Sequence, residues 1–182
     1  AEALEMYGKG RKILEDQGRV DNPDLATLYL NMALCKMAWK EVDAGIVLLQ
    51  KSRVIRQRLY GADHPLTASA YLHLGRAYLA QDLDEAAKEQ LDLAAATRLK
   101  ALGPDHVDMA DVYRAQASVL IRENEIPKAL ALMEHAFKIF KRDLGPRHEQ
   151  TQDVQAELAD VYLGLGRSSD ALVHLTQLAQ SK

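Results

Sequence analysis

The chain has 182 residues, and its 23 Lys and Arg against 26 Asp and Glu give a formal net charge of −3. This slightly acidic balance argues against a duplex-binding protein, which usually carries a net basic surface, and the lone basic run at 51–58 is predicted to be a solvated helix face. No stretch approaches the roughly 18 apolar residues of a membrane-spanning helix, and the single cysteine excludes an internal disulfide, so we expect a soluble, cytoplasmic protein in a reducing compartment.

The first predicted helix lies within residues 1–18, where an apolar face runs through Leu4, Tyr7, Ile13 and Leu14. We interpret it as the second helix of a preceding repeat, because its partner helix would lie upstream. The chain does not begin with Met, so we expect it to be part of a longer protein. Apolar faces left exposed at either end would then favour end-to-end association or a larger parent array.

From residue 19 onward the sequence repeats with a period of 42. Gly61, Gly103 and Gly145 are each 42 residues apart, and the histidine three residues after each glycine keeps the same spacing. This recurrence predicts a solenoid, with repeats at 19–60, 61–102, 103–144 and 145–182, the last one short at its C-terminal end. We assign the glycines to the left-handed position that closes a helix and the histidines to the turn that caps the next one.

Each repeat is predicted to contain two amphipathic helices. In the repeat 61–102, apolar residues recur at spacings of three and four on both sides of a break at 80–84, and the second stripe includes Leu83, Leu91 and Leu99. Small residues occupy two fixed positions, as Gly75 and Ala87 do in this repeat, and we expect the paired helices to approach closely there. The sequence therefore predicts an all-α fold.

Catalytic and metal-binding motifs do not emerge from the sequence. The segment YGKGRK at 7–12 has two glycines but lacks the Gly-Lys-Ser/Thr ending of a phosphate loop, and no His-Glu-x-x-His occurs. Cys35 lies among apolar residues of a predicted helix and is expected to be buried and inert. We therefore predict no enzyme activity, no cofactor and no metal site within these residues.

One repeat matches a known pattern at seven positions, which are Tyr71, Leu74, Gly75, Tyr78, Ala87, Leu91 and Ala94. They resemble the tetratricopeptide repeat, in which aromatic, Leu, Gly/Ala and Tyr positions precede Ala, a bulky apolar residue and Ala. The period of 42 and the G-x-x-H-P between repeats resemble the long, kinesin light chain-like type, and one register covers residues 1–182. The resemblance implies a right-handed α-α superhelix of stacked antiparallel helix pairs. HEAT or armadillo arrays have a similar period, but the spacing of the alanine positions disfavours them.

The resemblance also implies that the first helices of the repeats line a concave surface, which binds a peptide or helix of another protein. The candidates are the first-helix positions not used for packing: Thr27, Asn31, Leu34, Met37, Ser69, His73, Arg76, Asp111, Arg114, Ser118, Arg122, Asp153, Glu157 and Asp160. At Asn31 a family contact with the peptide backbone carries over directly. In chain order the surface starts uncharged, turns basic and then acidic, which predicts a ligand with an acidic middle and a basic end. Ordinary solvated helix positions explain the same residues equally well.

Leu30 and Leu34 occupy the places where chaperone-binding tetratricopeptide domains carry Lys and Asn, so a chaperone tail is not the expected ligand. We predict a non-catalytic scaffold for cargo or adaptor recognition, with a protein or peptide partner and neither nucleic acid nor membrane. The alternative is a regulatory domain, in which a bound peptide controls an attached effector domain outside this sequence.

Overall fold

The structure is a computed structural model that describes residues 2–16, 18 and 21–180. Residues 1, 19 and 182, at which predicted boundaries of the repeats fall, lie outside the described residues. The described chain contains nine helices and no strand: α1 (Glu2–Asp16), α2 (Pro23–Ala38), α3 (Val42–Tyr60), α4 (Pro65–Leu79), α5 (Asp84–Leu102), α6 (Val107–Arg122), α7 (Ile126–Asp143), α8 (Glu149–Gly164) and α9 (Ser168–Gln180). The prediction of an all-α solenoid of antiparallel helix pairs is confirmed.

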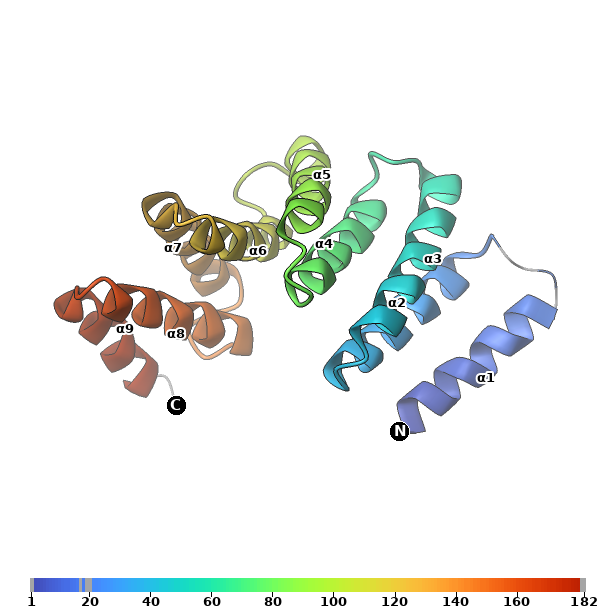
Figure 1. Cartoon of the computed structure of the whole chain (residues 1–182), viewed down its shortest axis with the longest axis horizontal. Coiled ribbons are helices and arrows are strands. Elements are labelled where there is room, and N and C mark those ends of the chain that lie inside the picture. The colour runs from blue at the N-terminus through green and yellow to red at the C-terminus, as the bar shows by residue number, and fades with distance from the viewer. Residues whose placement is uncertain (1, 17, 19–20, 181–182) are drawn as a thin grey trace. The chain divides into compact units, whose positions relative to one another are not determined.

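The chain divides into two compact units, residues 1–101 and 102–182. In the first unit α2 pairs with α3, α3 packs against α4, and α1 packs against α2 (Figure 1). One apolar core joins α2, α3 and α4 through Ala33, Leu49 and Leu74. Because α3 contacts both its own partner α2 and the first helix of the next pair, α4, these pairs stack without a single central core.

The second unit repeats this arrangement with α6 paired to α7 and α8 paired to α9, while α7 also packs against α8 (Figure 1). Its core includes Ala117 of α6, Met133 of α7, Leu158 of α8 and Ala171 of α9. No helix in the described part of the chain is both long and apolar enough to span a bilayer.

The repeated histidines cap the first helix of each pair, as the sequence predicts. The Nδ1 atoms of His64, His106 and His148 accept hydrogen bonds from the backbone N–H two residues later, at 3.1, 3.1 and 3.3 Å. Asn22 occupies the same place one period earlier and accepts from the N–H of Asp24 at 2.7 Å. The glycine three residues before each histidine has a positive φ of 89°, 82° or 88°, a conformation that glycine adopts without steric cost.

The predicted close crossing of paired helices is also confirmed. A Cβ atom added to Gly75 would lie 2.6 Å from Cγ of Leu91 and 3.2 Å from the carbonyl oxygen of Ala87. At Gly45 it would lie 2.9 Å from Cγ of Met37. Small residues at these positions therefore let the two backbones of a pair approach each other.

Two predictions about burial are wrong. Leu83 and Leu99 are exposed. Leu83 lies before the first residue of α5, and the buried stripe of α5 runs through Leu91 and then Arg98. Leu99 is one residue beyond that stripe, and one residue turns a helix by about 100°. Cys35 is half-buried, and not fully buried as predicted.

Candidate functional site

The predicted binding residues of α2 lie on a face that remains partly accessible. Thr27 and Leu34 are exposed, and Asn31 is half-buried between them. Their spacing of four and three residues places them along one side of the helix. Met37 continues this line, but it packs against the core of α2, α3 and α4, so its side chain is used for packing.

The predicted residues of α4 are more strongly engaged within the protein. Ser69, His73 and Arg76 are all half-buried. The hydroxyl of Ser69 accepts a hydrogen bond from the buried Arg98 of α5 at 3.2 Å and donates to the carbonyl oxygen of Pro65 at 3.4 Å. His73 and Arg76 also interact with other groups of the protein. This part of the first-helix surface is therefore less available than the part on α2.

In the second unit, the structure brings three of the predicted residues together as an ion-pair network. Arg114 of α6 donates to both carboxylate oxygens of Glu157 of α8, at 2.8 and 2.6 Å, and lies 3.5 Å from the carboxylate of Asp153. Burial alone would lower the pKa of the Arg114 guanidinium, but the hydrogen bond and charge of Glu157 outweigh it, so that the pKa is raised. Arg114 is therefore matched by neighbouring carboxylates, which changes the interpretation of this surface as basic and then acidic.

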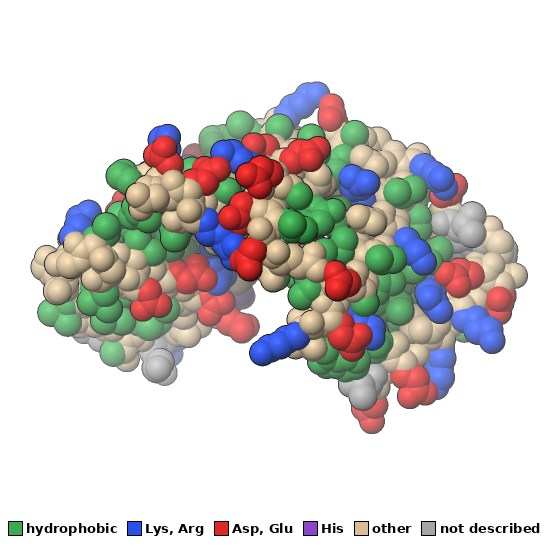
Figure 2. All heavy atoms as spheres, viewed as in Figure 1, with side chains coloured by type: hydrophobic (Ala, Val, Ile, Leu, Met, Phe, Trp, Pro, Cys, Tyr) green, Lys and Arg blue, Asp and Glu red, His purple; other side chains and the backbone are tan. Residues whose placement is uncertain are grey.

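Of the other predicted residues of the second unit, Asp111 also acts on Arg114 through its charge, which helps to raise the pKa of the guanidinium. Asp111 accepts from the side chain of Gln150 at 3.3 Å, and the exposed Ser118 donates to the carbonyl oxygen of Arg114 at 3.3 Å. Arg122 and Asp160 are exposed near the ends of α6 and α8. On the face of the molecule shown in Figure 2, basic, acidic and apolar side chains are interspersed.

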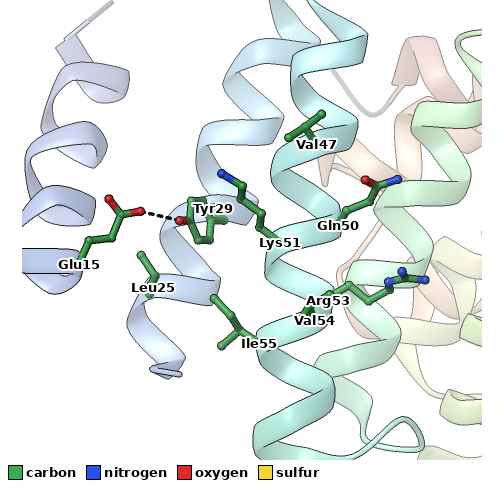
Figure 3. Close-up of a pocket in the computed structure, with 9 residues that line it drawn as sticks. All are labelled: Glu15, Leu25, Tyr29, Val47, Gln50, Lys51, Arg53, Val54 and Ile55. Carbon is green, nitrogen blue, oxygen red and sulfur yellow. Dashed lines mark hydrogen bonds between the residues drawn. The ribbon is translucent and has the colours of Figure 1, made fainter. Parts of the chain in front are cut away.

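A pocket that the sequence analysis did not identify lies on another side of α2. It has a volume of about 570 Å³ and is lined by Glu15, Leu25, Tyr29, Val47, Gln50, Lys51, Arg53, Val54 and Ile55. These residues come from α1, α2 and α3 (Figure 3). The tyrosine that recurs as Tyr29, Tyr71 and Tyr113 marks the helix seam beside the pocket, but its recurrence does not by itself indicate a pocket.

The chemistry of this pocket centres on Tyr29 and Lys51. The Tyr29 hydroxyl donates to the Glu15 carboxylate at 2.6 Å, and the Lys51 ammonium lies 5.4 Å from the centre of the Tyr29 ring (Figure 3). Burial, followed by the hydrogen bond to Glu15, raises the pKa of Tyr29 to about 12. At neutral pH the pocket therefore holds a neutral phenol between a carboxylate and an ammonium group.

Among the described residues, no group of three His, Cys, Asp or Glu side chains is placed to hold a metal ion.

Comparisons with known proteins agree with the fold. A sequence model of the tetratricopeptide repeat matches residues 24–100 and 108–180. The nearly identical TPR-like repeats of a Podosopora anserina protein assigned as a kinesin light chain have a TM-score of 0.73 at 24% identity, over 99% of this chain and 85% of theirs. BtubC (BKLC) from P. vanneervenii has a TM-score of 0.72 at 17% identity, over 88% of this chain and 64% of its own. A MamA structure has a TM-score of 0.61 at 21% identity, over 98% of this chain and 85% of its own. Identities this low show a shared fold, and the comparison with curated proteins gives no match.

Proposed function

We propose that this chain, which belongs to the tetratricopeptide repeat family, is a non-catalytic protein-interaction scaffold that binds a peptide or helix of a partner protein. The observation that carries the proposal is the accessible strip of Thr27, Asn31 and Leu34 on α2. The core positions of α2, such as Ala33, are separate from this strip and hold the helix in place. A rigid helix with an unused face is the element on which such proteins build a binding surface.

The chemistry of this strip suits the backbone and apolar side chains of a peptide. The Asn31 carboxamide can donate and accept hydrogen bonds at the same time, as a peptide group requires. Leu34 offers apolar surface one turn further along, and none of the three residues carries a charge. We therefore expect binding at α2 to depend on hydrogen bonds and apolar contact, with little dependence on salt.

Adaptor or cargo recognition, which the resemblance to kinesin light chain-like repeats implies, is part of this proposal. The predicted preference for a peptide of mixed charge stays a prediction. It is weakened at α6 and α8, because Arg114 already pairs with Glu157. A ligand that binds there must either leave this ion pair intact or provide new hydrogen-bond partners for both Arg114 and Glu157.

A selection from a random peptide library on the immobilised chain, followed by fluorescence anisotropy of the selected peptides, tests the site. The double variant Asn31→Ala, Leu34→Glu is expected to weaken binding at least tenfold. Leu93→Glu is the matched control, because Leu93 is an exposed leucine on the second helix α5 of the same unit. Equal affinity of the peptides for the double variant and for the wild-type chain would contradict the proposed site.

Self-association through the exposed face of α9 is also proposed. Leu172 is 64% exposed, whereas Leu130, at the equivalent position one period earlier, is 8% exposed because α8 covers it. The uncovered face of α9 can take a helix of a second copy in the same way. Sedimentation velocity should show an oligomer that increases with concentration and is lost in Leu172→Glu but kept in Leu93→Glu. A monomer at all concentrations would refute this part of the proposal.

A further inference from the structure

We infer that the pocket between α1, α2 and α3 is a second binding site, which takes an extended segment of a partner protein carrying an apolar side chain followed two residues later by a carboxylate. The pocket volume of about 570 Å³ is large enough for two or three side chains and falls within the usual range for ligand sites.

The pocket lies on a different side of α2 from the strip proposed above. Leu25 and Tyr29 line it, and they are four residues apart on one face of the helix. Thr27 and Asn31 each follow two residues later, which is a rotation of about 200° around the helix axis. The two sites therefore face opposite ways, and either can be occupied or lost without the other.

The apolar part of the pocket comes from two valines of α3. Val47 is 51% exposed and Val54 is 38% exposed, and the buried Leu25 and Ile55 line the pocket beside them. An apolar side chain that entered here would remove this exposed surface from water, which is the main favourable contribution to such contacts.

The charged part of the pocket is Lys51, which lies between the two valines on α3. Its side chain extends towards Tyr29 (Figure 3), and it forms no ion pair with any residue that the structure describes. Glu15 also lines the pocket, but its carboxylate accepts the Tyr29 hydroxyl and lies 3.8 Å from Nε of Arg11. Arg53 extends from the other side of α3 (Figure 3). The charge left unmatched between α1 and α3 is therefore the Lys51 ammonium, which favours a carboxylate.

The spacing of these groups sets the pattern of the ligand. Val47 and Lys51 are four helical residues apart, a rise of about 6 Å along α3. In an extended chain, side chains on one face are two residues apart, a distance of about 6.6 Å. A segment with an apolar residue at one position and Asp or Glu two positions later therefore matches Val47 and Lys51 together.

The tripeptide acetyl-Leu-Ser-Glu-amide is a suitable probe, titrated into the full chain and followed by ¹H–¹⁵N correlation spectra. We expect saturable shifts concentrated at Tyr29, Val47, Lys51 and Val54, with a dissociation constant in the millimolar range for so small a ligand. The substitution Lys51→Glu should weaken binding at least tenfold and should make acetyl-Leu-Ser-Lys-amide the better ligand. Lys138→Glu is the matched control: it changes the net charge equally, at an exposed lysine of the second helix α7.

Three outcomes would overturn the inference. They are the absence of shifts in the pocket up to about 10 mM probe, shifts that map to Thr27 and Asn31, and an equal loss of affinity in Lys51→Glu and Lys138→Glu. Binding at the pocket and binding at the Asn31 strip shift the signals of different residues. An absence of binding at the pocket therefore leaves the proposed scaffold function standing.

Discussion

A side chain at Gly75 of α4 would meet atoms of α5, and the substitution Gly75→Ala tests how closely α4 and α5 cross. The added Cβ would lie 2.6 and 2.7 Å from two side-chain atoms of Leu91 and 3.2 Å from the carbonyl oxygen of Ala87. Contacts below 3.0 Å require something to move. Leu91 is completely buried, so its displacement disturbs the surrounding core.

The magnitude follows from two opposing effects on the free energy of unfolding. Overpacking of a well-filled core costs about 1–3 kcal/mol, whereas replacing glycine by alanine inside a helix gains about 1 kcal/mol. We therefore expect Gly75→Ala to lower the stability of the first unit by up to about 2 kcal/mol. Gly8 of α1 is the matched control, because nothing lies within 4 Å of its added Cβ. Gly8→Ala has the same helix gain without the clash, so the difference between the two variants isolates the packing cost.

Gly45→Ala should fall between these two variants. Its added Cβ meets the flexible Met37 side chain at 2.9 Å and the Ala33 carbonyl oxygen at 3.3 Å, and a methionine adjusts more readily than a buried leucine.

Urea denaturation followed by far-ultraviolet circular dichroism measures all three variants. In a double-mutant cycle, Gly75→Ala should cost less in a Leu91→Ala background, because the clash is then relieved. If Gly75→Ala stabilised the chain as much as Gly8→Ala does, or if the cycle showed no coupling, the close crossing of α4 and α5 would be refuted.

Three further predictions concern single groups. His106→Ala removes the acceptor for the N–H of Asp108 and should lower the free energy of unfolding by about 1 kcal/mol. His106→Asn should restore this stability. Equal melting temperatures for the two variants would argue against the cap. Arg114→Met should lower the free energy of unfolding by about 1 kcal/mol, because the ion pair that it removes, with Glu157, is partly exposed. The absence of coupling to Glu157→Gln in a double-mutant cycle would contradict this. Burial lowers the pKa of the His174 imidazole, so its contribution to stability is present above the unfolded pKa of about 6.5 and is lost as the pH falls below that value towards the lowered folded pKa. The fall in melting temperature between pH 7.5 and 5 should be smaller in His174→Gln than in the wild-type chain. An equal fall in both would contradict a contribution from His174.

The period of 42 residues predicts much of the fold, because backbone features depend on position within the repeat. The cap at Asn22 could have been found by subtracting one period from His64. The same register contains an ion pair that the sequence analysis overlooked: Arg58 lies 3.2 Å from Asp21, and Lys100 lies 3.3 Å from Asp63, one period later. Both pairs are 37 residues apart in sequence and tie the end of a second helix to the start of its own pair.

The pairing of polar side chains between neighbouring first helices was harder to predict. Arg114 and Glu157 are 43 residues apart, one more than the period, and both were expected on the binding surface. The repeat brings α6 and α8 together, but the direction of a long side chain depends on packing that the sequence pattern does not specify. The predicted positions on the binding surface therefore could not show that the opposite charges of Arg114 and Glu157 pair with each other.

The pocket beside Tyr29 shows why a repeated fold does not imply a repeated site. One period later, Tyr71 is again a buried tyrosine that is hydrogen-bonded to the preceding second helix, although its hydroxyl accepts from Gln57 where Tyr29 donates to Glu15. The positions that would line its groove have changed, however, since Glu89 stands in the place of Val47 and Leu93 in the place of Lys51. The apolar wall has become a carboxylate and the cation has become a leucine, so a ligand with an acidic group would be repelled where the first site attracts it. The tyrosine is therefore shared because the helix seam needs it, whereas the ligand chemistry of the first site does not recur one period later.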